Sequence, residues 1–114
     1  MPETQPGKLL RIHVSEHDRF DGKPLYEAIV QKCREMKIAG ATVFKGLEGY
    51  GRTAEIHRAH LVSHDQPILI TIVDSESQVG KLIPVLDDML DTGLMAVSDV
   101  EVIRFQRASP GHHA

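Results

Sequence analysis

The sequence predicts a ferredoxin-like α+β domain, with a four-stranded antiparallel sheet that carries two helices on one face. Segments with the two-residue period of strands and segments with the helical period follow one another in the order β-α-β-β-α-β. The 114 residues are a typical length for one domain. Right-handed crossovers in the two β-α-β units then place all four strands in one sheet.

The first strand and helix are predicted from the N-terminal third of the chain. Residues 8–14 alternate between two sets of side chains, as a strand does. Asp21-Gly22 indicates a turn, and Pro24 suits the first position of a helix that Gly40 would end. Its apolar stripe consists of Leu25, Ile29, Cys33 and Met36.

Two further strands follow. Residues 41–45 predict the second strand, which leads into a segment with three glycines in six residues. Residues 52–66 are polar and rich in His, which is typical of a long loop. Residues 68–73 are almost continuously apolar and β-branched, which indicates a central strand.

A second helix and a last strand complete the predicted fold. Ser75 and Gln78 fit a capping box that opens the helix, Pro84 should kink it, and Gly93 should end it. Residues 100–105 predict the final strand. The buried stripe of the helix is expected to be Val79, Leu82, Ile83, Leu86 and Leu90.

The domain is expected to span residues 8–106, between a flexible N-terminus at 1–7 and a flexible tail at 107–114. Because both helices cover one face of the sheet, Leu9 and one side of the strand at 68–73 would face water. We therefore expect this open sheet face to pack against another subunit.

Composition excludes several classes of function. The chain has no Trp, three Phe, two Tyr and a net charge of -3, which argues against nucleic acid as a partner. A single cysteine, Cys33, permits no intramolecular disulfide. No signal peptide and no apolar stretch long enough for membrane insertion is present, so we expect a cytoplasmic protein. No catalytic arrangement of Ser, His, Asp or Cys stands out, and no enzyme activity is expected.

The glycine-rich segment is the first candidate site. Gly46, Gly49 and Gly51 would let backbone N–H groups approach an anion, and Arg52 offers a five-donor fork for phosphate. The alternative is a wide hairpin loop in which glycine supplies positive φ. Composition alone favours the second interpretation.

The second candidate site is a group of three histidines. His57, His60 and His64 are spaced i, i+3, i+7 and would share one face of a helix. Imidazoles at such a spacing suit Zn or Cu. The alternative is a polar loop that happens to contain histidine.

Several motifs resemble the PII signalling family. Residues 38–43 followed by Lys45-Gly46 and Gly49-Tyr50-Gly51-Arg52 look like the end of the second PII strand. Residues 102–104 resemble the final PII strand, which carries arginines that face the nucleotide. Residues 8–105 as a whole look closer still to a PII-like family of unknown function, domain of unknown function 190.

The resemblance implies a homotrimer that binds an adenine nucleotide (AMP, ADP or ATP) between subunits and contacts a target protein through the long loop. Relatives beside genes for fluoride exporters suggest a membrane transporter or channel as target. No redox cofactor is implied. The nucleotide site carried over by position consists of Thr42, Gly46, Gly49, Tyr50, Gly51, Arg52 and Arg104.

Two features depart from the PII pattern. The stretch Gly-Asp-Gly-Lys before the last strand is missing, because Thr92-Gly93-Leu94 runs directly into Met95. Donors for the distal phosphates are therefore reduced. The loop tyrosine that some PII proteins have modified is also missing. The leading hypothesis is a nucleotide-binding regulatory protein, and the alternatives are a metal-binding or metal-tolerance trimer and an adaptor without a small ligand.

Overall fold

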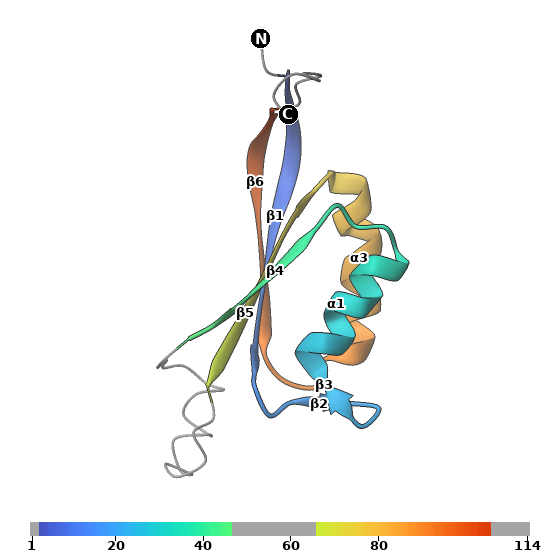
Figure 1. Ribbon diagram of the computed structural model, residues 1–114. Coiled ribbons are helices and arrows are strands. Elements are labelled where there is room, and N and C mark those ends of the chain that lie inside the picture. The colour runs from blue at the N-terminus through green and yellow to red at the C-terminus, as the bar shows by residue number, and fades with distance from the viewer. Residues whose placement is uncertain (1–2, 47–65, 106–114) are drawn as a thin grey trace, which may run out of the picture.

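A computed structural model describes residues 3–46 and 66–105, and it confirms the predicted ferredoxin-like fold (Figure 1). Four strands form one antiparallel sheet in the order β4-β5-β1-β6. Two helices, α1 and α3, cover one face of it. The bounds are β1 Glu3–Ser15, α1 Leu25–Glu35, β4 Ala41–Lys45, β5 Pro67–Asp74, α3 Glu76–Met89 and β6 Leu94–Arg104.

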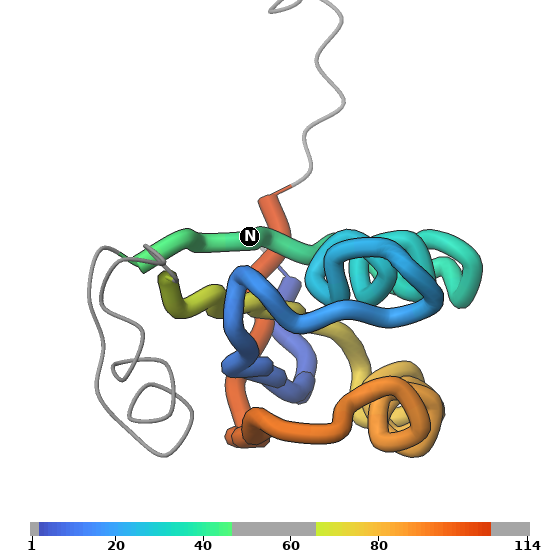
Figure 2. Tube along the Cα trace, turned by 90° about the horizontal axis from the view of Figure 1, so that it is seen from below, coloured from blue at the N-terminus to red at the C-terminus, as the bar shows by residue number. Residues whose placement is uncertain are grey.

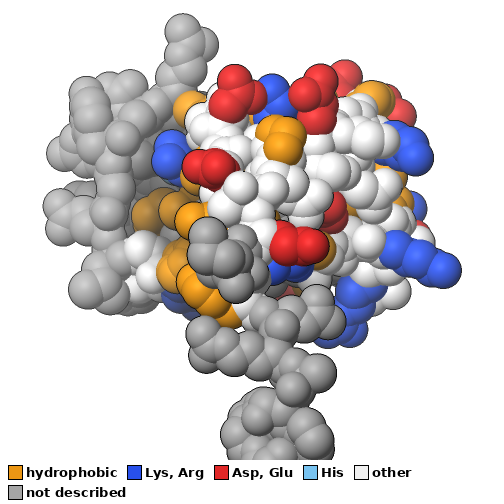
Figure 3. All heavy atoms as spheres, turned by 90° about the horizontal axis from the view of Figure 1, so that it is seen from above, with side chains coloured by type: hydrophobic (Ala, Val, Ile, Leu, Met, Phe, Trp, Pro, Cys, Tyr) orange, Lys and Arg blue, Asp and Glu red, His pale blue; other side chains and the backbone are white. Residues whose placement is uncertain are grey.

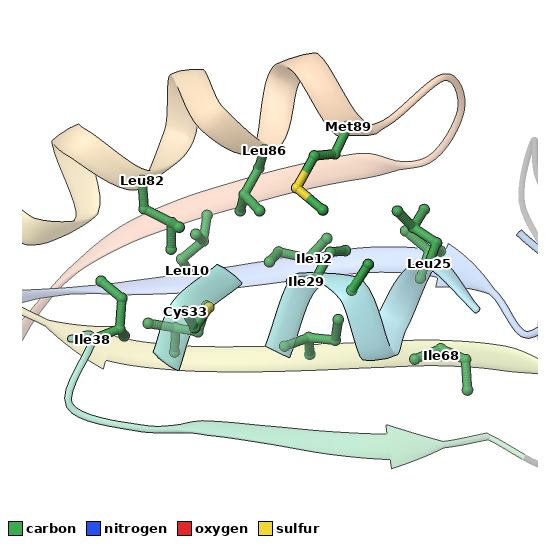
Figure 4. Close-up of a cluster of buried hydrophobic side chains, with 14 of the residues drawn as sticks. Leu10, Ile12, Leu25, Ile29, Cys33, Ile38, Ile68, Leu82, Leu86 and Met89 are labelled. Carbon is green, nitrogen blue, oxygen red and sulfur yellow. The ribbon is translucent and has the colours of Figure 1, made fainter. Parts of the chain in front are cut away.

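The core lies between the sheet and the two helices, which form a second layer side by side (Figure 2). β1 and β5 contribute alternate side chains to it, and these are almost entirely aliphatic. Figure 4 shows side chains from both strands and both helices pointing into the same layer. The fully buried members are Leu10, Ile12, Ile29, Ile68, Ile70, Ile72, Val79, Leu82 and Leu86.

Helix α1 ends three turns after it begins, earlier than the predicted stop at Gly40. Lys37 has φ 60°, the left-handed conformation that ends a helix. The Ile38 N–H donates to the Cys33 carbonyl at 2.9 Å, and the Lys37 N–H donates to the Arg34 carbonyl at 3.0 Å. These two bonds form a Schellman motif, so Lys37 performs the role that the sequence assigned to Gly40.

A small hairpin precedes α1 and was not expected. The strands β2 (Arg19–Phe20) and β3 (Lys23–Pro24) pair across the Asp21-Gly22 turn. Both turn residues have positive φ, 51° and 78°, as a two-residue type I′ turn requires. Pro24 occupies the N-cap position, one residue before the predicted first position of the helix, and its side chain makes no capping hydrogen bond.

Helix α3 begins as predicted but its capping box is only half formed. The Ser75 side chain accepts a hydrogen bond from the Gln78 N–H at 3.1 Å. The Ser75 N–H is bound by the Asp74 carboxylate instead of Gln78. The helix continues through Pro84 to Met89, and Gly93 (φ 111°) lies beyond its end, in the turn before β6.

Strands β1 and β6 are longer than predicted, so part of the segment expected to be a flexible N-terminus is strand. Residues 3–7 pair with β6 in the register Glu3↔Arg104 to Gly7↔Val100. Pro6 and Gly7 disfavour a strand in isolation, but here they pair only with β6, because β5 ends opposite Lys8. The two strands project beyond the helices as a ribbon (Figure 1), fastened by an ion pair between Lys8 and Asp99.

Neither helix of residues 3–46 and 66–105 lies over the second face of the sheet, as expected. We call it the open sheet face. By strand alternation and register it carries Leu9 and Arg11 of β1 and their neighbours on the other strands. Viewed along the strands, hydrophobic side chains reach the surface on the sheet side (Figure 3). The large exposed members on this face are Phe44, Val73 and Leu94.

The end of helix α1 yields a stability prediction. A residue with a Cβ at φ 60° is strained, whereas glycine is not. Lys37→Gly should therefore raise the free energy of unfolding by about 1 kcal/mol. Lys81→Gly, the same substitution on the exposed part of α3, should lower it by about 1 kcal/mol. Urea unfolding measures both, and a loss of stability in Lys37→Gly would contradict the Schellman assignment.

Candidate functional site

The candidate site lies where β1, β4 and β5 meet, at the two ends of residues 47–65. Backbone hydrogen bonds hold these two ends in place. The Gly46 N–H donates to the Pro67 carbonyl at 2.8 Å, and the Glu16 N–H donates to the Gln66 carbonyl at 3.0 Å. Residues 46 and 66 are therefore fixed beside the segment that follows β1. We call this junction the loop base.

Glycine is required at position 46 by packing. A Cβ there would lie 2.9 Å from the Pro67 Cγ, closer than real Cβ atoms come to a neighbour. The proline ring cannot swing away as a long side chain would. Gly46 is a predicted ligand contact, and its role in the structure is to close the loop base.

An ion pair crosses the loop base. The Lys45 Nζ lies 2.6 Å from the Glu16 Oε2, and the two side chains are 50% and 25% exposed. The hydrogen bond from Lys45 lowers the pKa of the Glu16 carboxyl, and the same bond raises the pKa of the Lys45 ammonium. Both groups therefore stay charged over the neutral range.

The turn after β1 holds Glu16 in place. The Ser15 N–H donates to the Asp18 carboxylate at 2.8 Å, and the His17 N–H donates to the Ser15 Oγ at 3.2 Å. The Leu25 N–H donates to the Asp18 carbonyl at 2.8 Å. Asp18 thus organises the backbone of this turn, through its carboxylate and through its carbonyl.

Thr42 and Arg104, two predicted nucleotide contacts, lie far apart within one chain. The register aligns Thr42 with Thr71, Arg11 and Ala96 across the sheet. Arg104 lies eight residues beyond Ala96 on β6. With about 3.3 Å per residue and 4.8 Å per strand, the two Cα atoms are separated by about 30 Å. Gly46 is farther still, because it lies at the opposite end of the sheet.

These two residues nevertheless share a face. Strand alternation places Thr42, Arg11 and Arg104 on the open sheet face. Thr42 and Arg104 are exposed there. A ligand that contacts both therefore needs a second chain against this face.

The remaining predicted residues lie outside the described part of the chain. They are the nucleotide contacts Gly49, Tyr50, Gly51 and Arg52 and the histidines His57, His60 and His64. Within residues 3–46 and 66–105, no three His, Cys, Asp or Glu side chains are placed to hold a metal ion. Cys33 is buried in the core, where desolvation raises its pKa to about 11.

Comparison with known proteins gives the family. Residues 7–102 match DUF190, described as "Uncharacterized ACR, COG1993". The chain belongs to the DUF190 family. A UPF0166 protein of Aquifex aeolicus (strain VF5) is 37% identical over 98 residues, which cover 84% of this chain and 92% of that protein.

Solved structures similar to this DUF190 protein have a PII-like fold. One is CPII, a nitrogen regulatory PII-like protein from Thiomonas intermedia K12, bound to ADP, AMP and bicarbonate. It gives a TM-score of 0.61 at 23% identity, over 90% of this chain and 92% of that one. A PII-like signaling protein from Thermus thermophilus gives 0.61 at 18% identity, over 89% and 92%. No helix in the described part of this chain is long and apolar enough to cross a membrane.

Neither the Glu16–Lys45 ion pair at the loop base nor the place of Arg11 on the open sheet face was predicted from the sequence. Glu16 sits in a polar turn, and nothing in its sequence neighbourhood distinguishes it from a solvated residue. Lys45 was noted only as part of the Lys45-Gly46 motif. Arg11 could have been found, because alternation along the first strand places it opposite the core.

The loop base yields a second stability prediction. Gly46→Ala must displace Pro67 or break the Gly46–Pro67 hydrogen bond, so the free energy of unfolding should fall by about 1–2 kcal/mol. Gly40→Ala is the matched control, since a Cβ at Gly40 meets nothing within 4 Å. It should leave stability unchanged or raise it by up to about 1 kcal/mol. Equal effects of the two substitutions in urea unfolding would contradict the packing argument.

Proposed function

We propose that this DUF190 protein is a PII-like regulatory protein, which binds an adenine nucleotide between the subunits of a homotrimer and signals to a partner. The family match and the PII-like fold support this class of protein. The nucleotides named for CPII, ADP and AMP, support adenine nucleotides as ligands. The protein acts as a cytoplasmic binding protein without enzymatic activity.

One observation carries the proposal that the site is shared between subunits. Thr42 and Arg104 lie on the open sheet face but about 30 Å apart in one chain. An arginine side chain spans only a small part of that distance. A neighbouring chain packed on this face would bring its Arg104 beside Thr42, and would cover Phe44, Val73 and Leu94 at the same time.

The glycine-rich segment provides the phosphate side of the proposed site. Gly46, Gly49 and Gly51 let backbone N–H groups come close to the phosphates, and Arg52 pairs with two phosphate oxygens. Thr42 and Tyr50 complete the same side. The turn before β6 is short and packed, since a Cβ at Gly93 would clash with the His13 carbonyl oxygen. It offers no lysine for distal phosphates.

The partner is contacted through the segment between residues 46 and 66. Both ends of that segment are fixed at the loop base. Nucleotide binding at the loop base therefore changes the conformation of the segment. The proposed partner is a membrane transporter or channel, which this protein regulates from the cytoplasm.

The assembly can be measured directly. Light scattering should give a mass about three times the 12.7 kDa of one chain. Phe44→Glu would place a charge on the open sheet face and should lower the measured mass. Arg19→Glu, on the exposed β2 strand, is the control and should leave the mass unchanged. A monomeric wild type at micromolar concentration would contradict the shared site.

Nucleotide binding can be tested at Arg52. Arg52→Ala should weaken the binding of AMP, ADP or ATP by roughly ten- to a hundredfold, because a charge-assisted hydrogen bond to phosphate is lost. Thermal stability should change little. Arg19→Ala is the matched control. Calorimetric titration measures all three proteins, and a wild type that binds none of these nucleotides at millimolar concentration would end the proposal.

Mixing variants distinguishes a shared site from a site within one chain. Arg52→Ala and Arg104→Ala homo-oligomers should both bind weakly. If each site takes Arg52 from one chain and Arg104 from its neighbour, random co-assembly of the two variants restores about a quarter of the sites. If both arginines come from one chain, co-assembly restores none.

A further inference from the structure

Arg11 lies in the middle of the open sheet face, on the central strand of the sheet. Its cross-strand neighbours on this face, Thr71 and Ala96, carry no charge. Leu9 and His13, the adjacent β1 residues on the same face, offer no carboxylate either. The Arg11 side chain is exposed in a single chain, but a second copy packed over this face would bury it. A buried charge without a partner is strongly unfavourable, so the interface must supply an anion.

Among the described residues of the four strands, one carboxylate shares this face with Arg11. It belongs to Glu3, at the end of the ribbon that β1 and β6 form (Figure 1). The other acidic residues of these strands, Asp74, Asp99 and Glu101, alternate to the helix side of the sheet. Glu3 lies eight residues before Arg11 on the same strand, or about 26 Å away at 3.3 Å per residue. The two side chains therefore cannot meet within one chain.

The proposed shared site brings these two positions together between chains. In that site Arg104 of a neighbouring chain lies beside Thr42. Glu3 is the register partner of Arg104, so their Cα atoms are about 5 Å apart on the neighbour. Arg11 lies in the same cross-sheet row as Thr42, two strands away, which is about 10 Å. Long arginine and glutamate side chains close this separation when β1 of the neighbour lies on the β1 side of Thr42.

We infer that Arg11 of each subunit forms an ion pair with Glu3 of a neighbouring subunit. This inference rests on the proposed function, because it specifies how two chains meet across the open sheet face. Each chain gives Glu3 to one neighbour and receives the Glu3 of the other at its own Arg11. Such a head-to-tail contact can close into a ring of three.

The pair gives the ribbon a function and fixes the register of the interface. Residues 3–7 extend β1 beyond the helices and carry Glu3 onto the neighbouring chain. A neighbour displaced along the sheet would place Glu3 against apolar side chains such as Phe44 or Leu9, and would leave Arg11 buried without an anion. The charges therefore select one arrangement of an otherwise largely apolar surface.

Exchange of the two charges tests the pair. Arg11→Glu and Glu3→Arg should each raise the concentration at which the assembly dissociates by roughly tenfold or more, because each places like charges together. The double variant Arg11→Glu/Glu3→Arg restores opposite charges and should assemble nearly as wild type does. Light scattering over a dilution series measures all four proteins. Both side chains are exposed in one chain, so circular dichroism should show a folded chain in every variant.

Glu101→Arg is the matched control for Glu3→Arg, because Glu101 lies on the same ribbon but on the helix side of the sheet. It should leave the dissociation concentration unchanged, as should Arg19→Glu, the control for Arg11→Glu. An equal effect of Glu101→Arg and Glu3→Arg would reduce the result to net charge and overturn the inference.

Two further results would overturn it. One is a double variant that assembles no better than the single variants. The other is dissociation by Arg11→Glu with no effect of Glu3→Arg, which would mean that a free anion neutralises Arg11. A wild type that is trimeric and binds ADP leaves the proposed function standing in each of these cases. A monomeric wild type overturns both the inference and the proposed function.

Discussion

The position of β1 in the middle of the sheet is the constraint on which the rest of the structure depends. It pairs with β5 over residues 8–15 and with β6 over residues 3–13. Its alternate side chains Leu10, Ile12 and Val14 enter the core, which fixes the register of both neighbours. The same alternation sends Arg11 to the open sheet face. The core and the proposed interface are thus set by one strand.

The order of elements and most of the core could be predicted from the sequence. Buried positions recur with the period of a strand or of a helix, and this period is visible in the pattern of apolar residues. Ile68, Ile70 and Ile72 show this for β5, and Val79, Leu82 and Leu86 for α3. The ends of elements were harder. Lys37 takes a conformation that favours glycine, because Ile38 is pulled into the core and fixes the turn. Residues 3–7 are weak strand formers that become strand because β6 offers a partner.

The candidate site was predictable only where residue type limits the chemistry. Glycines and arginine next to a strand end indicate anion binding, and Gly46 proved to have a packing reason as well. Glu16 and Lys45 are 29 residues apart in sequence, and surface charges at such a separation carry no signal of their contact. Their pairing follows from the antiparallel order of β4, β5 and β1, which is known only once the sheet is formed. The strand order of the sheet therefore determines which residues lie next to a predicted site.

The hydrogen bond between Gly46 and Pro67 has an evolutionary consequence. It closes the sheet before residue 47 and after residue 65, so the packing of the core does not depend on the length of the chain between them. Loop-closure entropy makes each doubling of such a chain cost only about 0.6 kcal/mol. Insertions, deletions and substitutions there are therefore tolerated by the folded domain. One scaffold can acquire new binding specificities by variation in this segment while its core sequence stays constrained.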